Sequence, residues 1–342
     1  MTISRKHKFI TIPIALIILL YLIGPSPDAP TYSLDMPIVP QEADALEQYI
    51  ALQEAQHKLK PDNEARIVWA DSSKKKTEYS VVYLPGFSAS QAEGDPVHRQ
   101  FAKAFGCNLY LARMSDHGID TTEQLLYFTP DRFWKSSKEA LAIGKALGEK
   151  VIIMSTSTGG TMALLLAADY PMDVFALINM SPNIEINDPL AFAANNPWGL
   201  QVARQVKGGK YNITRITPGA DSTLDMRYWN HRYRLEAVTQ LQEMLESSMT
   251  KSTFHKVKCP SLTLYYYKNE KEQDPTVKVS AMEKMNTHLS TPEKSKVMVA
   301  IPNAGGHVIG SYVVSKDVKQ VAAEITNFAI GILKMTPAGN KE

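Results

Sequence analysis

The sequence predicts an α/β fold with a mostly parallel central sheet and helices on both of its faces. Apolar, β-branched runs alternate with helical patterns from about residue 66 to the C-terminal region. These runs are apolar throughout, which is typical of strands that are buried on both faces. The chain has 342 residues, and no part of it repeats another, so one large domain with an insertion accommodates it.

The predicted elements follow one another in a regular order. The expected strands are residues 66–70, 79–86, 107–113, 151–155, 174–181, 262–267 and 296–302. The expected helices are residues 41–59, 97–105, 131–148, 161–170 and 314–334. Pro61 and Pro171 end two of them because proline cannot continue a helix. The alternation lapses over residues 187–256, and we expect this stretch to be a helical cap inserted into a single domain of residues 41–342.

The charge balance argues against nucleic-acid binding. Lys and Arg number 37 against 35 Asp and Glu, and the formal net charge is +2. Arg5, Lys6 and Lys8 supply three of the positive charges, so the rest of the chain is close to neutral. A neutral surface provides no field for a phosphate backbone. We therefore expect no nucleic-acid partner.

The two cysteines indicate neither a disulfide scaffold nor a metal site. Cys107 and Cys259 are too few for a scaffold, and neither has a neighbour at metal-ligand spacing. Each precedes an apolar run, which favours two separate buried thiols. A single bridge between them is the alternative. No metal or organic cofactor is expected.

The N-terminus carries an apolar segment, residues 9–23, behind a basic stretch at residues 5–8. Its length is short of the roughly 20 residues of a spanning helix and within the range of a signal-peptide core. Pro30 directly follows Ala29, which makes the nearest cleavage site poor. We expect residues 1–24 to be an uncleaved signal anchor, a transmembrane helix that places the domain outside the cytoplasm. A cleaved signal peptide, giving a secreted or periplasmic protein, is the alternative.

Residues 25–40 form the predicted link between this segment and the domain. Five prolines over this stretch prevent regular structure. They predict an extended, semi-rigid spacer.

The segment most informative about chemistry surrounds Ser157. An apolar strand, a Ser155-Thr156-Ser157-Thr158-Gly159 turn and an apolar helix follow each other directly. This order matches the nucleophile elbow, in which a G-x-S-x-G turn exposes a serine on a strained backbone. Ser155 departs from the pattern because a glycine is usual at that position.

A serine nucleophile needs a base and an acid, and the sequence offers both after later strands. His307 lies on a glycine-bearing loop after the last predicted strand, and Asp274 follows the strand 262–267. The order Ser, Asp, His is that of one class of hydrolases. Glu270 and Glu272 are rivals for the acid, but they alternate with lysines as a solvated charge run does.

The nucleophile also needs two backbone N–H groups for an oxyanion hole. Thr158 directly follows Ser157 at the start of the helix, and Phe87 lies in the Pro85-Gly86-Phe87-Ser88 turn after the strand 79–86. We expect the amides of Thr158 and Phe87 to be the two donors.

With these motifs together, the chain resembles the α/β-hydrolases, in particular esterases and monoacylglycerol-lipase-like enzymes. The resemblance covers about residues 66–334 and rests on the turn at Gly86, the elbow at Ser157, Asp274 and Gly306-His307. His117, in Asp116-His117-Gly118, is similar to the histidine of the family's G-H-G turn and is interpreted as structural.

The resemblance implies a serine hydrolase that cleaves a small-molecule or lipid ester through an acyl-enzyme. Trp198, Tyr228, Trp229 and Tyr233 of the cap are candidates for an acyl pocket, and simple packing is their alternative role. The same fold also serves peptidases and acyltransferases. Pro85, where the family usually has histidine, and Ser155 leave a second hypothesis: a membrane-tethered, non-catalytic binding protein on a hydrolase scaffold.

Overall fold

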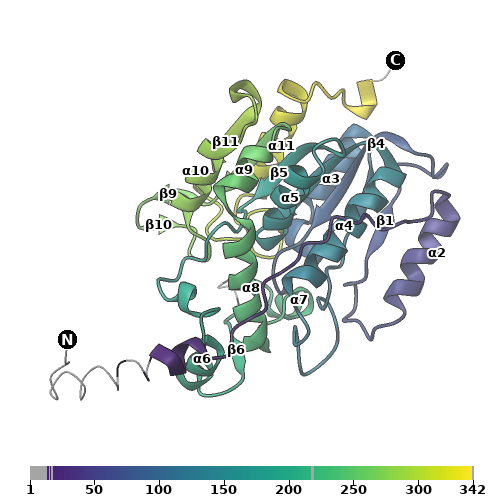
Figure 1. Cartoon of the computed structure of the whole chain (residues 1–342). Helices are drawn as coiled ribbons and strands as arrows, with labels where there is room; N and C mark the ends of the chain where they lie inside the picture. The colour runs from purple at the N-terminus through teal and green to yellow at the C-terminus, as the bar shows by residue number, and fades with distance from the viewer. Residues whose placement is uncertain (1–13, 15, 17, 217–218, 341–342) are drawn as a thin grey trace, which may run out of the picture.

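The computed structural model describes residues 14, 16, 18–216 and 219–340. Its central sheet has the strand order β1-β3-β2-β4-β5-β8-β11, and every neighbouring pair is parallel except β1 with β3. The strands are β1 Arg66–Val68, β2 Thr77–Leu84, β3 Asn108–Leu111, β4 Gly148–Thr156, β5 Val174–Met180, β8 Ser261–Tyr265 and β11 Lys296–Ala300. The predicted mostly parallel sheet is therefore confirmed (Figure 1).

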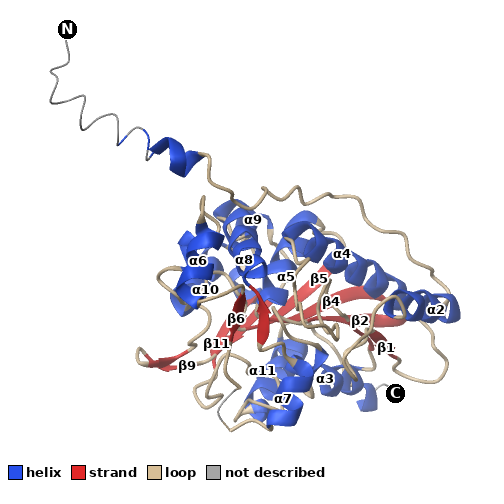
Figure 2. Ribbon diagram, turned by 90° about the horizontal axis from the view of Figure 1, so that it is seen from below, coloured by secondary structure: helices blue, strands red, loops and turns tan. Residues whose placement is uncertain are grey.

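Helices cover both faces of the sheet (Figure 2). One face carries α4 (Pro130–Leu147) and α5 (Thr158–Asp169), and the other carries α3 (Val97–Phe105) and α11 (Val318–Gly331). The buried side chains accordingly form two large apolar clusters, one on each side of the sheet. The strands are apolar throughout because both of their faces lie in one of these clusters.

The structure departs from the expected elements in two helices and contains one strand arrangement that the sequence does not predict. The first helix, α2 (Ala43–Glu54), ends well before Pro61. The strands β1 and β2, which follow each other in the chain, do not pair, because β3 lies between them. The helix α10 (Val279–His288) was not predicted, since its polar face interrupts the apolar pattern that sequence reasoning relies on.

Residues 187–256, the predicted cap, lie between β5 and β8 and are largely helical. They contain η2 (Ala191–Ala193), α6 (Gly199–Lys207), α7 (Ser222–Tyr228), α8 (Leu235–Ser248), α9 (Lys251–Lys256) and the hairpin of β6 (Tyr211–Ile213) with β7 (Arg232–Arg234). The remaining short elements are η1 (Gln91–Gly94), β9 (Tyr267–Asn269), β10 (Glu272–Gln273), η3 (Glu293–Ser295) and η4 (Ala338–Asn340).

The proline-rich stretch 25–40 is extended, and it is not a free spacer. It runs along the domain surface over α4. Asp131 accepts a hydrogen bond from the Tyr32 amide at 2.8 Å, and the buried Lys138 donates to the carbonyls of Ser33 and Asp35, both at 2.6 Å. These contacts attach the stretch to the domain.

The predicted membrane anchor falls mostly on residues 1–13, 15 and 17, which lie outside the described residues. Among the residues that are described, no helix combines the length and the apolar character needed to cross a bilayer.

Candidate functional site

Four loops meet at one edge of the sheet, where the parallel strands β2, β4, β8 and β11 have their carboxyl ends. Ligand sites in open α/β sheets lie at this edge. Ser157 directly follows β4, and the turn at Gly86 follows β2. Asp274 lies on the chain beyond β8, and His307 on the loop after β11. The candidate residues of the sequence analysis therefore come from these four loops.

Ser157 stands in a strained turn between β4 and α5. Its backbone has φ 52° and ψ −121°, a conformation that a residue with a side chain rarely adopts. Its N–H donates to the Met180 carbonyl on β5 at 3.0 Å, and its own carbonyl accepts from Gly160 and Asn183. The turn is thus held from three directions, as a nucleophile elbow requires.

Gly159 and Ser155 occupy the two positions where strand and helix come closest. A Cβ on Gly159 would lie 2.0 Å from the Leu84 carbonyl oxygen, so only glycine fits there. Ser155, which departs from the usual glycine, is fully buried, and its hydroxyl donates to the Asn179 side chain on β5 at 2.8 Å. The neighbouring strand thus accommodates the departure.

The structure brings Asp274 and His307 together. Asp274 Oδ2 lies 2.7 Å from His307 Nδ1, and Asp274 Oδ1 accepts the amides of Thr276 and Val277 at 2.8 and 3.0 Å. The carboxylate is completely buried. All of its hydrogen bonds therefore fix its orientation toward the imidazole.

The two rival acids do not reach His307. Glu270 is exposed and accepts a hydrogen bond from the Tyr267 hydroxyl. Glu272 is exposed and pairs with Lys268 at 2.9 Å. Both belong to the β9–β10 region and lie on its solvent side.

The environment of His307 favours its protonated form. Burial opposes protonation, but the charge and the hydrogen bond of Asp274 outweigh it, and the Glu93 carboxylate adds to them, so the pKa of His307 is raised. Its Nε2 is buried and has no hydrogen-bond partner among the described residues, Ser157 included. This nitrogen is therefore available to accept a proton once a substrate closes the site.

The turn that carries Phe87 is fixed on both sides of the residue. The Gly86 amide donates to Glu93 Oε2 at 2.6 Å, and the Ser88 amide donates to His117 Nε2 at 2.9 Å. The Phe87 ring packs edge-on against Phe128 at a centroid distance of 5.1 Å. The turn also lies against Ser157, because a Cβ on Gly86 would come within 2.8 Å of Ser157 Cβ.

His117 has the structural role that the sequence analysis expects. Its Nδ1 lies 2.8 Å from the Ser115 carbonyl, which only accepts, so Nδ1 carries the proton and Nε2 is the acceptor for Ser88. Burial lowers the pKa of His117 to about 4. The ring is therefore neutral at physiological pH.

Thr158 supplies the second amide named by the sequence analysis. It is the first residue of α5, and its amide is one of the first-turn N–H groups that intrahelical bonding leaves free. The helix dipole places partial positive charge at the same end. An oxyanion beside Ser157 would therefore be stabilised by the Thr158 amide and by the partial positive charge at the start of α5.

The cap aromatics divide into two groups. Tyr228 and Trp229 are buried in a small apolar cluster with Ala92 of η1, and the ring of Tyr233 lies 5.2 Å from that of Phe87. Trp198 is 40 % exposed, and its indole N–H donates to the Leu20 carbonyl, so it contacts the N-terminal segment. Trp198 therefore does not line the site.

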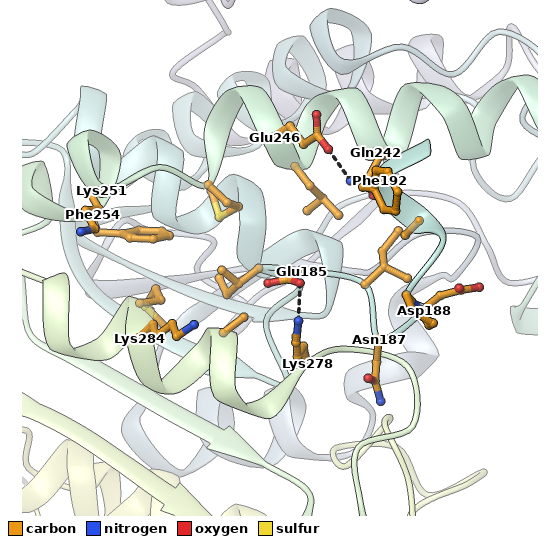
Figure 3. A pocket seen from close by; sticks show the side chains of 18 of the residues that line it. Glu185, Asn187, Asp188, Phe192, Gln242, Glu246, Lys251, Phe254, Lys278 and Lys284 are labelled. Atoms are coloured by element: carbon orange, nitrogen blue, oxygen red, sulfur yellow. Dashed lines mark hydrogen bonds and ion pairs between the residues drawn. The ribbon is translucent and has the colours of Figure 1, made fainter. Parts of the chain in front are cut away.

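A cavity of about 730 Å³ opens between η2, α8, α9 and α10 (Figure 3). Ser157 is not among the residues that line it. Its interior is apolar, and charged side chains, among them the Lys278–Glu185 pair, lie around it. Asn187 on its wall donates to the Asp274 carbonyl at 3.2 Å. The cavity therefore adjoins the candidate site through Asn187, next to the Asp274 backbone.

Both cysteines are free thiols, as the sequence analysis favours. Within the described residues, no group of three His, Cys, Asp or Glu side chains has the arrangement of a metal site.

Sequence reasoning missed Glu93 and Asn187. Asn187 carries no pattern that predicts a contact with the acid loop. Glu93 had one usable signal: it is a carboxylate in the mainly uncharged segment that follows the Phe87 turn.

Comparisons with known proteins identify the fold. Neither the protein-family models nor the curated proteins contain a match. Among solved structures, one of the metagenome-derived lipolytic enzymes LipS and LipT superposes with a TM-score of 0.63 at 15% identity, over 79% of this chain and 98% of the other. A monoacylglycerol lipase of Paleococcus ferrophilus (TM-score 0.58, 13% identity, 78% and 98% covered) is also similar. A soluble variant of the monoglyceride lipase of Saccharomyces cerevisiae is similar too, with a TM-score of 0.59 at 11% identity, over 80% of this chain and 91% of the other. The chain has the α/β-hydrolase fold.

The elbow predicts a strong effect of one methyl group. Gly159→Ala forces a Cβ against the backbone of Leu84, which cannot move without breaking the sheet, so we expect a loss of about 3 kcal/mol or more in unfolding free energy. Denaturant unfolding followed by circular dichroism measures it. Gly209→Ala is the control, because open space surrounds that position, and its change should stay within about 0.5 kcal/mol. Equal stability of the two variants would refute the close approach.

Proposed function

We propose that this protein is a serine hydrolase that cleaves carboxylic esters through an acyl-enzyme. The observation that carries the proposal is the 2.7 Å contact of His307 with a completely buried Asp274, at the same sheet edge as the strained Ser157. A nucleophile, a base and an orienting acid are the groups that this chemistry requires.

In the first half-reaction, Ser157 Oγ attacks the ester carbonyl carbon while its proton passes to His307 Nε2. Asp274 holds the imidazole through Nδ1 and stabilises the imidazolium that forms. The amides of Phe87 and Thr158 stabilise the negative charge on the carbonyl oxygen. His307 then returns the proton to the departing alcohol, and the acyl group stays on Ser157.

In the second half-reaction, a water molecule takes the place of the alcohol. His307 removes its proton, the hydroxide oxygen bonds to the acyl carbon, and the Ser157–acyl bond breaks with the proton returned to Ser157. The products are a carboxylic acid and free enzyme.

The structural neighbours support esters as the substrate class. The three similar structures above are a lipolytic enzyme, a monoacylglycerol lipase and a monoglyceride lipase. At 11–15% identity they share the fold with this chain, and the transfer of their activity is our proposal. We propose a small-molecule or lipid ester as the substrate.

Two alternatives remain as competing proposals. A peptidase or an acyltransferase would use the same residues, with an amide as the substrate or an alcohol as the acceptor. A non-catalytic, membrane-tethered binding protein would keep the fold without turnover. The bond between Asp274 and His307 favours an enzyme, because a binding protein gains nothing from an imidazole whose Nε2 stays unpartnered in a buried site.

For the location we propose an anchored domain outside the cytoplasm, on the basis of the basic residues 5–8 and the apolar run 9–23. Release as a secreted or periplasmic protein is the competing proposal.

Labelling with a fluorophosphonate probe tests the nucleophile. We expect the wild-type protein to be labelled at Ser157 and to hydrolyse p-nitrophenyl esters, and Ser157→Ala to lose both properties. Mass spectrometry of the labelled peptide identifies the modified serine. A folded wild-type protein that is neither labelled nor active would overturn the enzyme proposal, and amide turnover without ester turnover would replace it by a peptidase.

Substitution of Asp274 and of its rival Glu270 tests which carboxylate orients His307. Asp274→Asn leaves an amide that favours the wrong tautomer of His307, so kcat should fall on the order of 10⁴-fold with the fold intact. Glu270→Gln is the matched control, because this exposed carboxylate lies in the same segment, and its kcat should stay within a few-fold of wild type. A crippled Glu270→Gln variant beside an active Asp274→Asn variant would reassign the acid.

Two truncations test the location and the linker. The full chain should fractionate with membranes, and a chain that starts at Pro25 should be soluble with the melting temperature of the intact domain. A chain that starts at Gln41 should melt several degrees lower, because it loses the contacts of residues 31–36 with α4. A mature N-terminus near Pro30, found by protein sequencing, would replace the anchor by a cleaved signal.

A further inference from the structure

Glu93 is a buried carboxyl group beside the nucleophile that the reaction above does not use. Its side chain is 3 % exposed, and Oε2 accepts the Gly86 amide at 2.6 Å. A Cβ placed on Gly86 would lie 3.0 Å from this oxygen and 2.8 Å from Ser157 Cβ. Glu93 thus stands directly behind the turn that presents the Phe87 amide. Burial of a carboxylate is costly unless hydrogen bonds compensate it.

The short helix η1 that carries Glu93 is fixed by three parts of the protein. Gly94 packs so closely on the Tyr83 ring of β2 that a Cβ there would lie 2.4 Å from it. The Ser311 hydroxyl, from the loop after His307, donates to the Ala92 carbonyl at 2.7 Å. The Trp229 side chain, at the end of the cap helix α7, lies close enough to Glu93 to lower the pKa of its carboxyl group. The position of the carboxyl group is therefore set by the sheet, the base loop and the cap together.

The charges around Glu93 link it to the base. Burial raises the pKa of Glu93 to about 7, although the Gly86 amide, the charge of His307 and the Trp229 side chain each lower it. In return, the Glu93 carboxylate adds to the effect of Asp274 in raising the pKa of His307. Burial raises the pKa of Tyr83, the titratable group that β2 presents to Glu93, and the charges of Glu93 and Asp95 raise it further. Glu93 and His307 therefore act on each other: the charge of each favours the charged form of the other.

We propose that Glu93 is a positioning residue of the active site: its carboxylate holds the oxyanion turn through the Gly86 amide and acts through space on His307, so that one buried group serves both halves of the catalytic apparatus. The assignment rests on the proposed serine hydrolase function. Glu93 neither touches the reacting atoms nor replaces Asp274, which alone of the two is bonded to His307.

Two substitutions of Glu93 separate the two parts of this role. Glu93→Ala removes the acceptor for Gly86, so the turn loses its support and kcat should fall by about tenfold or more, with KM little changed. Glu93→Gln keeps an oxygen for the Gly86 amide but removes the negative charge. Loss of that charge destabilises the imidazolium, so the pKa of His307 falls and the neutral base persists to lower pH.

The experiment compares wild type with Glu93→Gln by two readouts. In the pH profile of kcat/KM for a p-nitrophenyl ester, the acid limb of Glu93→Gln should move by about half a pH unit or more toward lower pH. In NMR titrations of histidine-labelled protein, the His307 resonance, assigned by its loss in His307→Gln, should move in the same direction. Glu93→Gln should also recover most of the kcat that Glu93→Ala loses.

Asp62→Asn is the matched control. Asp62 is a partly exposed carboxylate that accepts a 2.6 Å hydrogen bond from Tyr228, the neighbour of Trp229 in the cap. The Asp62→Asn substitution weakens the hold on α7, the helix that ends at Trp229, but it removes no charge that acts on His307. Neither the acid limb nor the His307 titration should therefore move.

An unchanged His307 titration in folded Glu93→Gln would overturn the proposal, and so would an equal shift in Asp62→Asn. The NMR titration decides this even where no ester is hydrolysed. A wild-type protein without labelling or turnover would refute the serine hydrolase, whereas an active wild type with an unmoved Glu93→Gln profile would refute the role of Glu93 alone.

Discussion

The close approach of Gly159 to the Leu84 carbonyl is the constraint on which the geometry of the site depends. It allows α5 to start directly at the end of β4, and this leaves Ser157 no room for an ordinary backbone conformation. The strain at Ser157 is held by hydrogen bonds to β5 and to the chain after it. The same contact brings the end of β2 next to Ser157, and the turn with Phe87 follows from there. One packing contact between backbone atoms thus places Ser157, the proposed nucleophile, next to the amides that we propose as its oxyanion donors.

Around this contact, the polar groups of the site are each fixed by a second polar group. Asp274 is oriented by two amides before it meets His307, and His117 is oriented by a carbonyl before it accepts from Ser88. Fixed dipoles of this kind need no reorganisation when charge develops on a substrate. The arrangement is therefore suited to a reaction that passes through an oxyanion, which is what we propose for it.

The sequence was informative wherever one local pattern fixes a structure. Ser157 was predicted because strand, turn and helix follow each other within a few residues, and Asp274 and His307 because each follows a later strand in the order Ser, Asp, His. The parallel sheet followed from its apolar strands. Glu93 was missed although its place in a mainly uncharged segment is a signal, because its importance arises from contacts with β2, the base loop and the cap, which are distant in the chain. The helix α10 was missed for a related reason: its apolar residues face α9 and the core only in the folded chain.

The packing of residues 31–36 on α4 has a consequence for how the domain is held. Only about six residues, 25–30, separate this packed stretch from the apolar segment, and the Trp198 amide already binds the Pro25 carbonyl. Six extended residues span about 20 Å, so the domain cannot turn freely about its N-terminus. Residues 18–23 are thereby held close to the domain, and the helix α6, which begins beside Trp198, lies next to them. Any surface that bound these residues would therefore face α6, and the domain would take one orientation on it.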